Sequence, residues 1–485
     1  MNDLIQKLEP RVVWENFVDI SLIPRRSNEE GRAREFVQSK ARDLGLESTA
    51  DSAGNLLVRK KGRGGGREKP VAILQSHLDM VCVAEKGTSH DFGKDPLRLR
   101  SDGKYVMASG TSLGADNGMG VAAMLALMQD DSLETGPLDF LFTVDEETGL
   151  TGALDLDPGL LRGRRLLNFD TSEEGTLIIG CSGGMNVVST FPFTKIAMPA
   201  ESGHFSIGIG GLTGGHSGLD IHRHRANAIK LLAGLLLEVG RVMRFPICGF
   251  EGGDKSNVIP REASAVILAP KGKEEWLERT ALDYIAGKRK EYGPDEPNLQ
   301  LEIKEAMDFQ SKGHVMDAGS VARLAEFLQE VPHGTAAMSR IFPDVVETSS
   351  NLATARWGDG TVTVGMNCRS PVDASMDALA ASIKKLADRF GMYTALGSRY
   401  PGWLPDLDSP LLKKARAAYK EKFGKEPKVR AVHAGLECGV IGSKAPGMDI
   451  ISFGPTIKDL HSPRERVEIS SVDRFWGLVK EMVEF

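Results

Sequence analysis

Short apolar runs alternate with segments of helical period in the first third of the chain. The segments 71–74, 138–144 and 165–169 are largely apolar, as expected for strands that are buried on both faces of a parallel sheet. Between the first two, apolar residues recur at helical spacing over 119–128. This alternation predicts an α/β fold in which helices flank a mostly parallel central sheet.

The pattern changes in the middle of the chain. Strands are predicted at 204–209, 257–269, 299–303 and 361–368. Helices are predicted between and after them at 226–239, 318–328 and 374–389. These strands are less continuously apolar than those of the first third, so this region is predicted to be an inserted α+β domain.

The character of the first third returns near the carboxyl end, with a predicted helix at 410–422 and an apolar strand at 449–453. The 485 residues are enough for two or three domains. We therefore predict a discontinuous α/β domain made of 1–186 and 398–485, interrupted by an inserted α+β domain at 187–397.

Composition excludes several classes of protein. The net charge of −6 provides no global positive field for nucleic acid, and no apolar run approaches the roughly 18 residues of a membrane span. The basic, glycine-rich run 60–67 is interpreted as a solvated hairpin loop. The five cysteines are widely spaced and include no C-x-x-C pair, as is typical of buried thiols in a reducing cytoplasm.

Histidines and acidic residues follow the predicted strands or precede a helix. They are His77, Asp79, Asp116, Glu146, Glu147, Asp170 and His461. Open α/β sheets gather their ligand sites at the carboxyl ends of the strands, so these side chains can converge on one edge. Taken singly, the His77 and Asp79 pair fits a hydrogen-bonded histidine beside a solvated aspartate, and Glu146 with Glu147 fits a solvated acidic turn.

Gathered in one place, these groups require a cation. Clustered carboxylates oppose one another's ionisation unless positive charge balances them. Mixed nitrogen and oxygen ligands suit zinc best, with cobalt or manganese as alternatives. Two divalent ions about 3.5 to 4 Å apart that share a carboxylate are the expected geometry of a two-metal hydrolase.

Five motifs resemble those of a known enzyme family. They are SHLDM at 76–80, GADNG at 114–118, DEETG at 145–149, NFD at 168–170 and GGHSG at 214–218. Their order and spacing are similar to those of the dinuclear zinc peptidases that include aminoacylases and succinyl-diaminopimelate desuccinylase. The resemblance extends over nearly the whole chain.

The resemblance implies a complete set of metal ligands. His77 and Asp170 would bind one zinc ion, Glu147 and His461 would bind the other, and Asp116 would bridge the two. The expected cofactor is therefore two Zn²⁺ per chain.

Two further carboxylates receive catalytic roles from the resemblance. Asp79 would orient His77, as carboxylates commonly do beside a ligating imidazole, and Glu146 would be the general base. Aspartate at position 170 is similar to the aminopeptidase and dipeptidase branch of the family, whereas glutamate there is typical of the carboxypeptidases.

The inserted domain matches the lid domain of the family. Asn257 and Arg369 match positions that hold the carboxylate end of the substrate, and a guanidinium suits this task because it forks onto two oxygens. His216 matches a histidine that supports the oxyanion. Without the resemblance, each of the three residues fits a structural role equally well. Asn257 could cap a turn, Arg369 could form a surface ion pair, and the segment of His216 could be only a tight turn.

We therefore predict a cytoplasmic metallopeptidase that hydrolyses dipeptides with free amino and carboxyl ends, including those that end in histidine. The family likeness also makes a homodimer an expectation, whereas no nucleic acid or membrane partner is expected. One alternative is an N-acyl amino acid amidohydrolase on the same scaffold, against which Asp170 argues. The other is a non-catalytic zinc or peptide-binding relative, against which Glu146 argues because pure binding requires no base.

Overall fold

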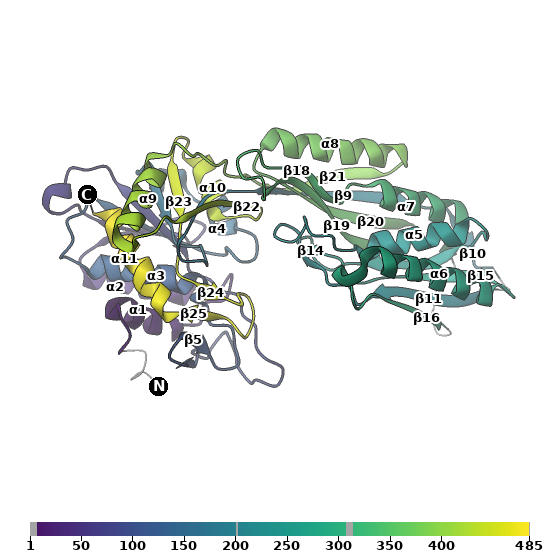
Figure 1. Cartoon of the computed structure of the whole chain (residues 1–485), viewed down its shortest axis with the longest axis horizontal. Helices are drawn as coiled ribbons and strands as arrows, with labels where there is room; N and C mark the ends of the chain where they lie inside the picture. The colour runs from purple at the N-terminus through teal and green to yellow at the C-terminus, as the bar shows by residue number, and fades with distance from the viewer. Residues whose placement is uncertain (1–6, 200–201, 307–313, 485) are drawn as a thin grey trace. The chain divides into compact units, whose positions relative to one another are not determined.

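The computed structural model describes residues 7–199, 202–306 and 314–484 (Figure 1). It divides into two compact units. Unit 1 consists of Met1–Cys181, Trp403–Ala431 and Gly435–Phe485, and unit 2 consists of Ser182–Gly402 and Val432–Ala434. The first six residues of the segment 1–186 lie outside the described residues.

Unit 1 is built on an eight-stranded sheet with the order β1-β2-β6-β3-β7-β23-β8-β22. The strands are β1 (Glu47–Ala50), β2 (Leu56–Lys60), β3 (Ala72–His77), β6 (Leu138–Thr143), β7 (Arg165–Asn168), β8 (Thr176–Cys181), β22 (Lys428–Val432) and β23 (Asp449–Ser452). The four central strands, β6, β3, β7 and β23, run parallel. Because they run parallel, their carboxyl ends meet at one edge of the sheet.

Helices flank this sheet. They are α1 (Arg11–Ser21), α2 (Gly31–Asp43), α3 (Ala115–Gln129), α4 (Thr151–Leu154), α9 (Pro410–Phe423), α10 (Glu437–Lys444) and α11 (Ile469–Val483). Helix α3 is almost entirely buried because its residues are apolar or small on every side. A smaller sheet of unit 1 holds β24 (Ile457–Lys458), β25 (Arg466–Glu468), β5 (Tyr105–Ala108) and β4 (Leu99–Ser101), and short 3₁₀ turns lie at Gly64–Gly66 and Pro158–Leu160.

Unit 2 contains an antiparallel sheet whose main path is β16-β11-β15-β13-β19-β20-β9-β21. Its strands are β9 (Gly183–Pro192), β11 (Ser202–Gly210), β13 (Ile247–Gly252), β15 (Ala263–Pro270), β16 (Gln300–Glu305), β19 (Val346–Trp357), β20 (Thr361–Ser370) and β21 (Tyr393–Tyr400). Beside this path lie β10 (Lys195–Ala197), β17 (His314–Met316) and β18 (Gly334–Met338), and a separate pair is formed by β12 (Gly215–His216) and β14 (Val258–Ile259).

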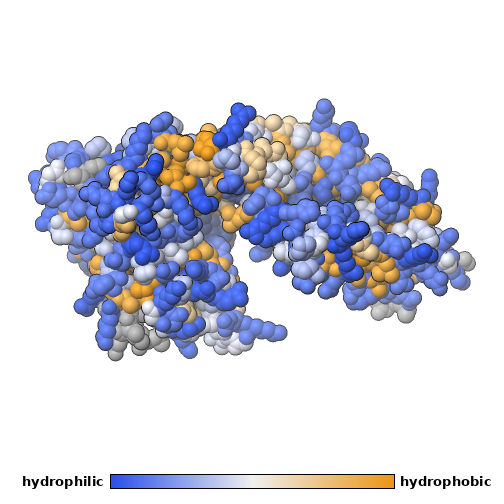
Figure 2. Space-filling view, viewed as in Figure 1, coloured by the Kyte–Doolittle hydropathy of each residue, from blue (hydrophilic) through white to orange (hydrophobic). Residues whose placement is uncertain are grey.

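The helices of unit 2 are α5 (Ala228–Gly240), α6 (Glu274–Tyr292), α7 (Ala318–Glu330) and α8 (Asp373–Arg389), with a 3₁₀ turn at Gly293–Asp295. Burial alternates along β9, β11 and β20, so one face of the sheet packs into a shared apolar core with the helices. On the side of the molecule that Figure 2 shows, the surface is mostly hydrophilic with scattered apolar residues.

The predicted fold class is confirmed, with a helix-flanked, mainly parallel sheet in unit 1 and a separate antiparallel α+β unit. Two local predictions are wrong. The single strand expected at 257–269 is divided into β14 and β15, because Pro260 between them has no N–H to donate to a ladder. The basic run 60–67 is not a hairpin, because β6 lies between β2 and β3 in the sheet.

Two further expectations concern the cysteines and the membrane. All five cysteines are free, and Cys82 is partly exposed rather than buried. None of the helices in the described ranges combines the length and apolar content that a membrane crossing requires.

Candidate metal centre

Three of the five predicted ligands lie at or just after the carboxyl ends of three parallel strands. His77 is the last residue of β3, the Glu146 and Glu147 pair lies in the turn after β6, and Asp170 lies two residues after β7. Asp116 stands in the first turn of α3, where its backbone angles are not yet helical. Parallel pairing therefore brings together side chains that are far apart in the sequence.

The first group of facing side chains is His77, Asp116 and Asp170. The Nε2 atom of His77 lies 3.1 Å from Oδ1 of Asp116 and 3.4 Å from Oδ1 of Asp170. The side-chain amide of Asn117 donates to the same Asp170 oxygen at 2.7 Å. One imidazole nitrogen thus faces two carboxylates.

The second group is Asp116, Glu147 and His461. The Nε2 atom of His461 lies 3.1 Å from Oε2 of Glu147 and 3.5 Å from Oδ2 of Asp116. Asp116 is therefore common to both groups and turns one carboxylate oxygen toward each imidazole. These five residues are the ligands that the sequence predicts, and the structure brings their side chains together in two groups that share Asp116.

Asp79 lies behind His77 and is fully buried. Its Oδ1 lies 3.3 Å from Nδ1 of His77, and its two carboxylate oxygens accept the backbone N–H groups of Glu146 and Glu147 at 3.1 Å each. Burial alone would raise the pKa of Asp79, but His77, the Ser27 hydroxyl and the Glu146 N–H lower it to about 2. One ionised carboxylate thus faces His77 and also anchors the Glu146 turn.

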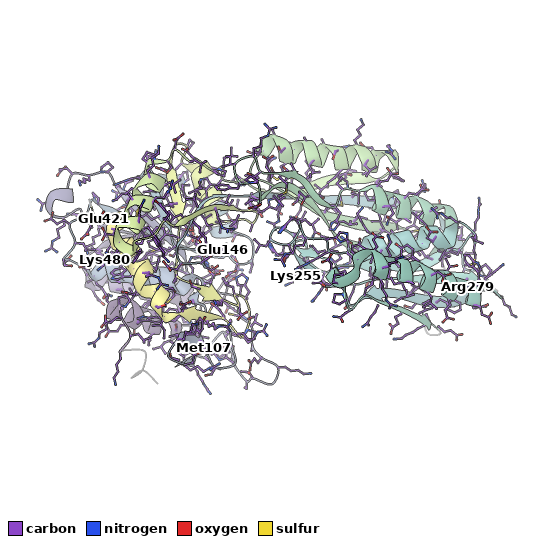
Figure 3. The ribbon with its side chains drawn as sticks, viewed as in Figure 1. Met107, Glu146, Lys255, Arg279, Glu421 and Lys480 are labelled. Atoms are coloured by element: carbon purple, nitrogen blue, oxygen red, sulfur yellow. The ribbon has the colours of Figure 1, made fainter. Side chains whose placement is uncertain are left out.

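Glu146 lies in the loop after β6, where Figure 3 labels it. One of its carboxylate oxygens belongs to a third group of facing atoms with His77 and Glu147. Burial raises its pKa well above the usual range, and the charges of Asp170 and Glu147 add to this effect although His77 opposes it. The side chain is therefore disposed to hold a proton, as a general acid–base group must.

The charges in these groups are unbalanced. Burial and the charge of Asp116 raise the pKa of Asp170 to about 7. Burial opposes a charge on His461, yet Asp116 and Glu147 raise the pKa of His461 to about 11. Without a cation these shifts favour the protonated forms of Asp170 and His461, and bound divalent cations would favour the deprotonated forms that act as ligands.

One orphaned atom supports the fit to a cation. Oε1 of Glu147 is buried and has no hydrogen-bond partner among the described residues, which is costly for a carboxylate oxygen unless a ligand satisfies it. With imidazole nitrogens and carboxylate oxygens as donors, the residues present fit zinc.

In unit 2, the three predicted lid residues gather around Ser217. Its backbone N–H donates to the carbonyl oxygen of Asn257 at 2.8 Å, and its hydroxyl accepts from Nε of Arg369 at 3.1 Å. Nδ1 of His216 accepts the N–H groups of Gly218 and Leu219 at 3.2 and 3.1 Å. The proton of neutral His216 therefore resides on Nε2, which makes that atom a donor.

Arg369 is a buried cation without an acidic partner among the residues that the structure describes. It is 5% exposed, and its Nη1 donates to the hydroxyl of Tyr400 at 2.9 Å. Buried charges are normally paired, so this guanidinium fits an anion supplied from outside the chain. By contrast, Asn257 is exposed. It is held beside Ser217 by its backbone carbonyl oxygen, which accepts the Ser217 N–H.

Sequence reasoning missed two buried charged residues of unit 1. Glu465 accepts backbone N–H groups of the segment that carries Asp116, and Arg25 donates to the carbonyl oxygens of Leu78 and Asp79. Both side chains form hydrogen bonds with backbone groups. Because every residue offers such groups, the sequence contains no signal that identifies these contacts. The only available hint is that Glu465 follows His461 by four residues.

The family model described as peptidase family M20/M25/M40 matches residues 73–484. The chain belongs to this family and is a hydrolase that acts on peptide bonds. It is 36% identical to the cytosol non-specific dipeptidase of Escherichia coli strain K12 over 484 residues, which cover 100% of this chain and 99% of that protein.

Solved structures agree with this assignment. The aminoacylhistidine dipeptidase of Vibrio alginolyticus has a TM-score of 0.85 and 35% identity, with 100% of this chain and 99% of that chain covered. The aminopeptidase PepT of Bacillus cereus has a TM-score of 0.58 at 15% identity over 98% of both chains, and this likeness concerns the fold alone. The predicted resemblance to the peptidase family is confirmed, and both of these full-length relatives with 35% identity or more are named as dipeptidases.

Proposed function

We propose that this protein is a cytoplasmic di-zinc dipeptidase that cleaves dipeptides with free amino and carboxyl ends, including those that end in histidine. The proposal rests on one observation: the two carboxylate oxygens of Asp116 face two different histidines, His77 and His461. The names of the full-length relatives, a cytosol non-specific dipeptidase and an aminoacylhistidine dipeptidase, support the substrate class and the compartment.

The metal ligands divide into two sets around the shared carboxylate. His77 and Asp170 would hold one ion, Glu147 and His461 would hold the other, and Asp116 would contact both. When bound, the ions would polarise the peptide carbonyl and lower the pKa of a water to about 7.

The chain's own residues would carry the proton transfers. Glu146 takes a proton from the attacking water, whose oxygen bonds to the carbonyl carbon, and returns it to the leaving nitrogen as the C–N bond breaks. Asp79 keeps His77 oriented and holds the Glu146 turn through two backbone N–H groups.

Unit 2 would recognise the substrate. Arg369 would bind the substrate's terminal carboxylate with its guanidinium, which is buried without an acidic partner among the described residues. Asn257 would contact the same end of the substrate. Nε2–H of His216 would donate to the oxygen that becomes negative in the transition state, where such a donor acts most strongly.

Replacing Arg369 by alanine should weaken cleavage of dipeptides at least tenfold in kcat/KM. Removing one partner of a buried charge pair costs about 2 to 5 kcal/mol. A dipeptide with an amidated carboxyl end should be a poor substrate of the native protein, and its cleavage should decrease little further in the variant. The measurement is kcat/KM for both substrates in the native protein and the variant.

The matched control for this experiment is Arg356→Ala. Arg356 is an arginine of the same sheet whose side chain is 42% exposed and contacts Asp254, so the variant should keep both activities. Equal losses on the free and the amidated dipeptide in Arg369→Ala would rule out the carboxylate role.

A substrate panel with metal analysis tests the proposed function as a whole. Purified protein should contain zinc and should cleave a histidine dipeptide faster than a tripeptide or an acetyl-amino acid. Preference for the acetyl-amino acid would instead identify an amidohydrolase. Zinc binding without hydrolysis of any member would identify a binding protein.

A further inference from the structure

Glu465 is a buried carboxylate that contacts main chain rather than side chains. It is 3% exposed. Its Oε2 accepts the N–H groups of Leu113 and Gly114 at 2.8 and 2.9 Å, and its Oε1 accepts those of Ala115 and Asp116 at 2.8 and 3.3 Å. Four consecutive N–H groups that lead into α3 thus converge on one side chain.

The same turn is held from its other side by Arg25. This guanidinium is 1% exposed and donates to the carbonyl oxygen of Gly114 as well as to those of Leu78 and Asp79. Gly114 has a φ of +65°, and a Cβ there would lie 2.6 Å from Nη2 of Arg25. The turn before Asp116 is therefore closed between an anion on its N–H groups and a cation on its carbonyl group.

Glu465 also belongs to the loop that carries His461. Glu465 lies four positions after His461, and its hydrogen bonds span about 350 residues of sequence to reach the Asp116 turn. One side chain therefore fixes the distance between two main-chain segments, each of which supplies a member of the second ligand group.

We propose that Glu465 is a positioning residue that sets the geometry of Asp116 relative to His461 and so determines the affinity of the site for zinc. The inference rests on the proposed function. Groups that orient metal ligands typically change metal affinity or activity by about 10 to 100-fold when they are replaced. Hydrogen bonds from N–H groups to an ionised carboxylate are also stronger than neutral ones, so few other side chains can replace it.

The test is zinc binding by the full-length chain after removal of its metal. Glu465→Gln has a single carbonyl oxygen, and its amide NH₂ opposes the remaining N–H groups of the turn. We expect the zinc dissociation constant, measured by competition with a chelating dye, to rise by about 10 to 100-fold. The visible absorption bands of the cobalt-loaded protein should change in shape, because these bands report ligand geometry.

A second variant covers the case in which Glu465→Gln does not fold. Glu465→Asp keeps the charge but is one methylene shorter, so it cannot reach all four N–H groups and should weaken zinc binding in the same direction.

Asp449→Asn is the matched control within unit 1. Asp449 caps α9 by accepting the N–H of Leu411 at 2.9 Å, and it lies at the amino end of β23, away from the ligand edge. This variant should lower the thermal midpoint while leaving zinc affinity and the cobalt spectrum unchanged.

Each outcome decides a different point. Native zinc affinity and a native cobalt spectrum in the folded Glu465 variants would overturn the positioning role alone. Equal losses of zinc affinity in the Glu465 variants and in Asp449→Asn would show that Glu465 contributes only to the general stability of the fold. A native protein that binds no zinc would overturn the proposed function and this inference together.

Discussion

Glu146→Gln should keep the metal content and the substrate affinity of the native protein while lowering kcat by roughly 10² to 10⁴. Glutamine has the size of glutamate but cannot accept and return a proton at neutral pH. The contact that places this turn is the backbone N–H of Glu146 on Asp79, and the substitution leaves that contact intact. The loss should therefore fall on the chemical step alone.

The contrast with the neighbouring Glu147 makes this prediction specific. Glu147 faces His461 at 3.1 Å, so Glu147→Gln should lose zinc as well as activity. The measurements are zinc per chain, kcat and KM for a histidine dipeptide in both variants. Near-native turnover by Glu146→Gln would remove this residue from the proton path, and zinc loss in that variant would make it a ligand.

The strands that position the site could be predicted because burial on both faces leaves a strong signal. The runs that became β3, β6 and β7 are nearly fully buried, and a polar residue after each run stands out against them. Once these strands are taken as parallel, His77, Glu147 and Asp170 must share an edge. Sequence therefore anticipated this part of the site from local patterns.

Other elements left no comparable signal. Helix α6 has charged residues over most of its length and buries only Leu277, Ala281 and Ile285, so its apolar stripe is too narrow to detect by periodicity. The return of 432–434 to unit 2 is three residues long, which is shorter than any period. Such features depend on contacts made by the folded chain.

The residues that hold the predicted ligands in place could not be predicted from the sequence for a related reason. Glu465 and Arg25 contact peptide groups, and every residue offers the same N–H and C=O groups. Ligand types can be recognised by their chemistry, whereas a side chain that caps a turn is recognised only when the turn is seen. Sequence thus indicated which side chains would converge on this edge of the sheet but not what holds them in place.

Asp116→Ala should remove zinc from both proposed sites together and abolish activity with it. The two oxygens of Asp116 face His77 at 3.1 Å and His461 at 3.5 Å, so each group of ligands loses one member in a single substitution. The remaining carboxylates and imidazoles are divided between two incomplete sets. The measurement is zinc per chain by elemental analysis after dialysis against zinc-free buffer.

His461→Ala provides the comparison that separates a shared ligand from a general disturbance. His461 is half exposed and faces only the second group, Asp116 and Glu147, so this variant should lose the zinc of that group and retain the other. If Asp116→Ala also retained one ion per chain, the carboxylate would belong to a single site. Loss of both ions in Asp116→Ala and of one in His461→Ala is the pattern that only a bridging carboxylate produces, because a folding defect would not distinguish the two ligand groups.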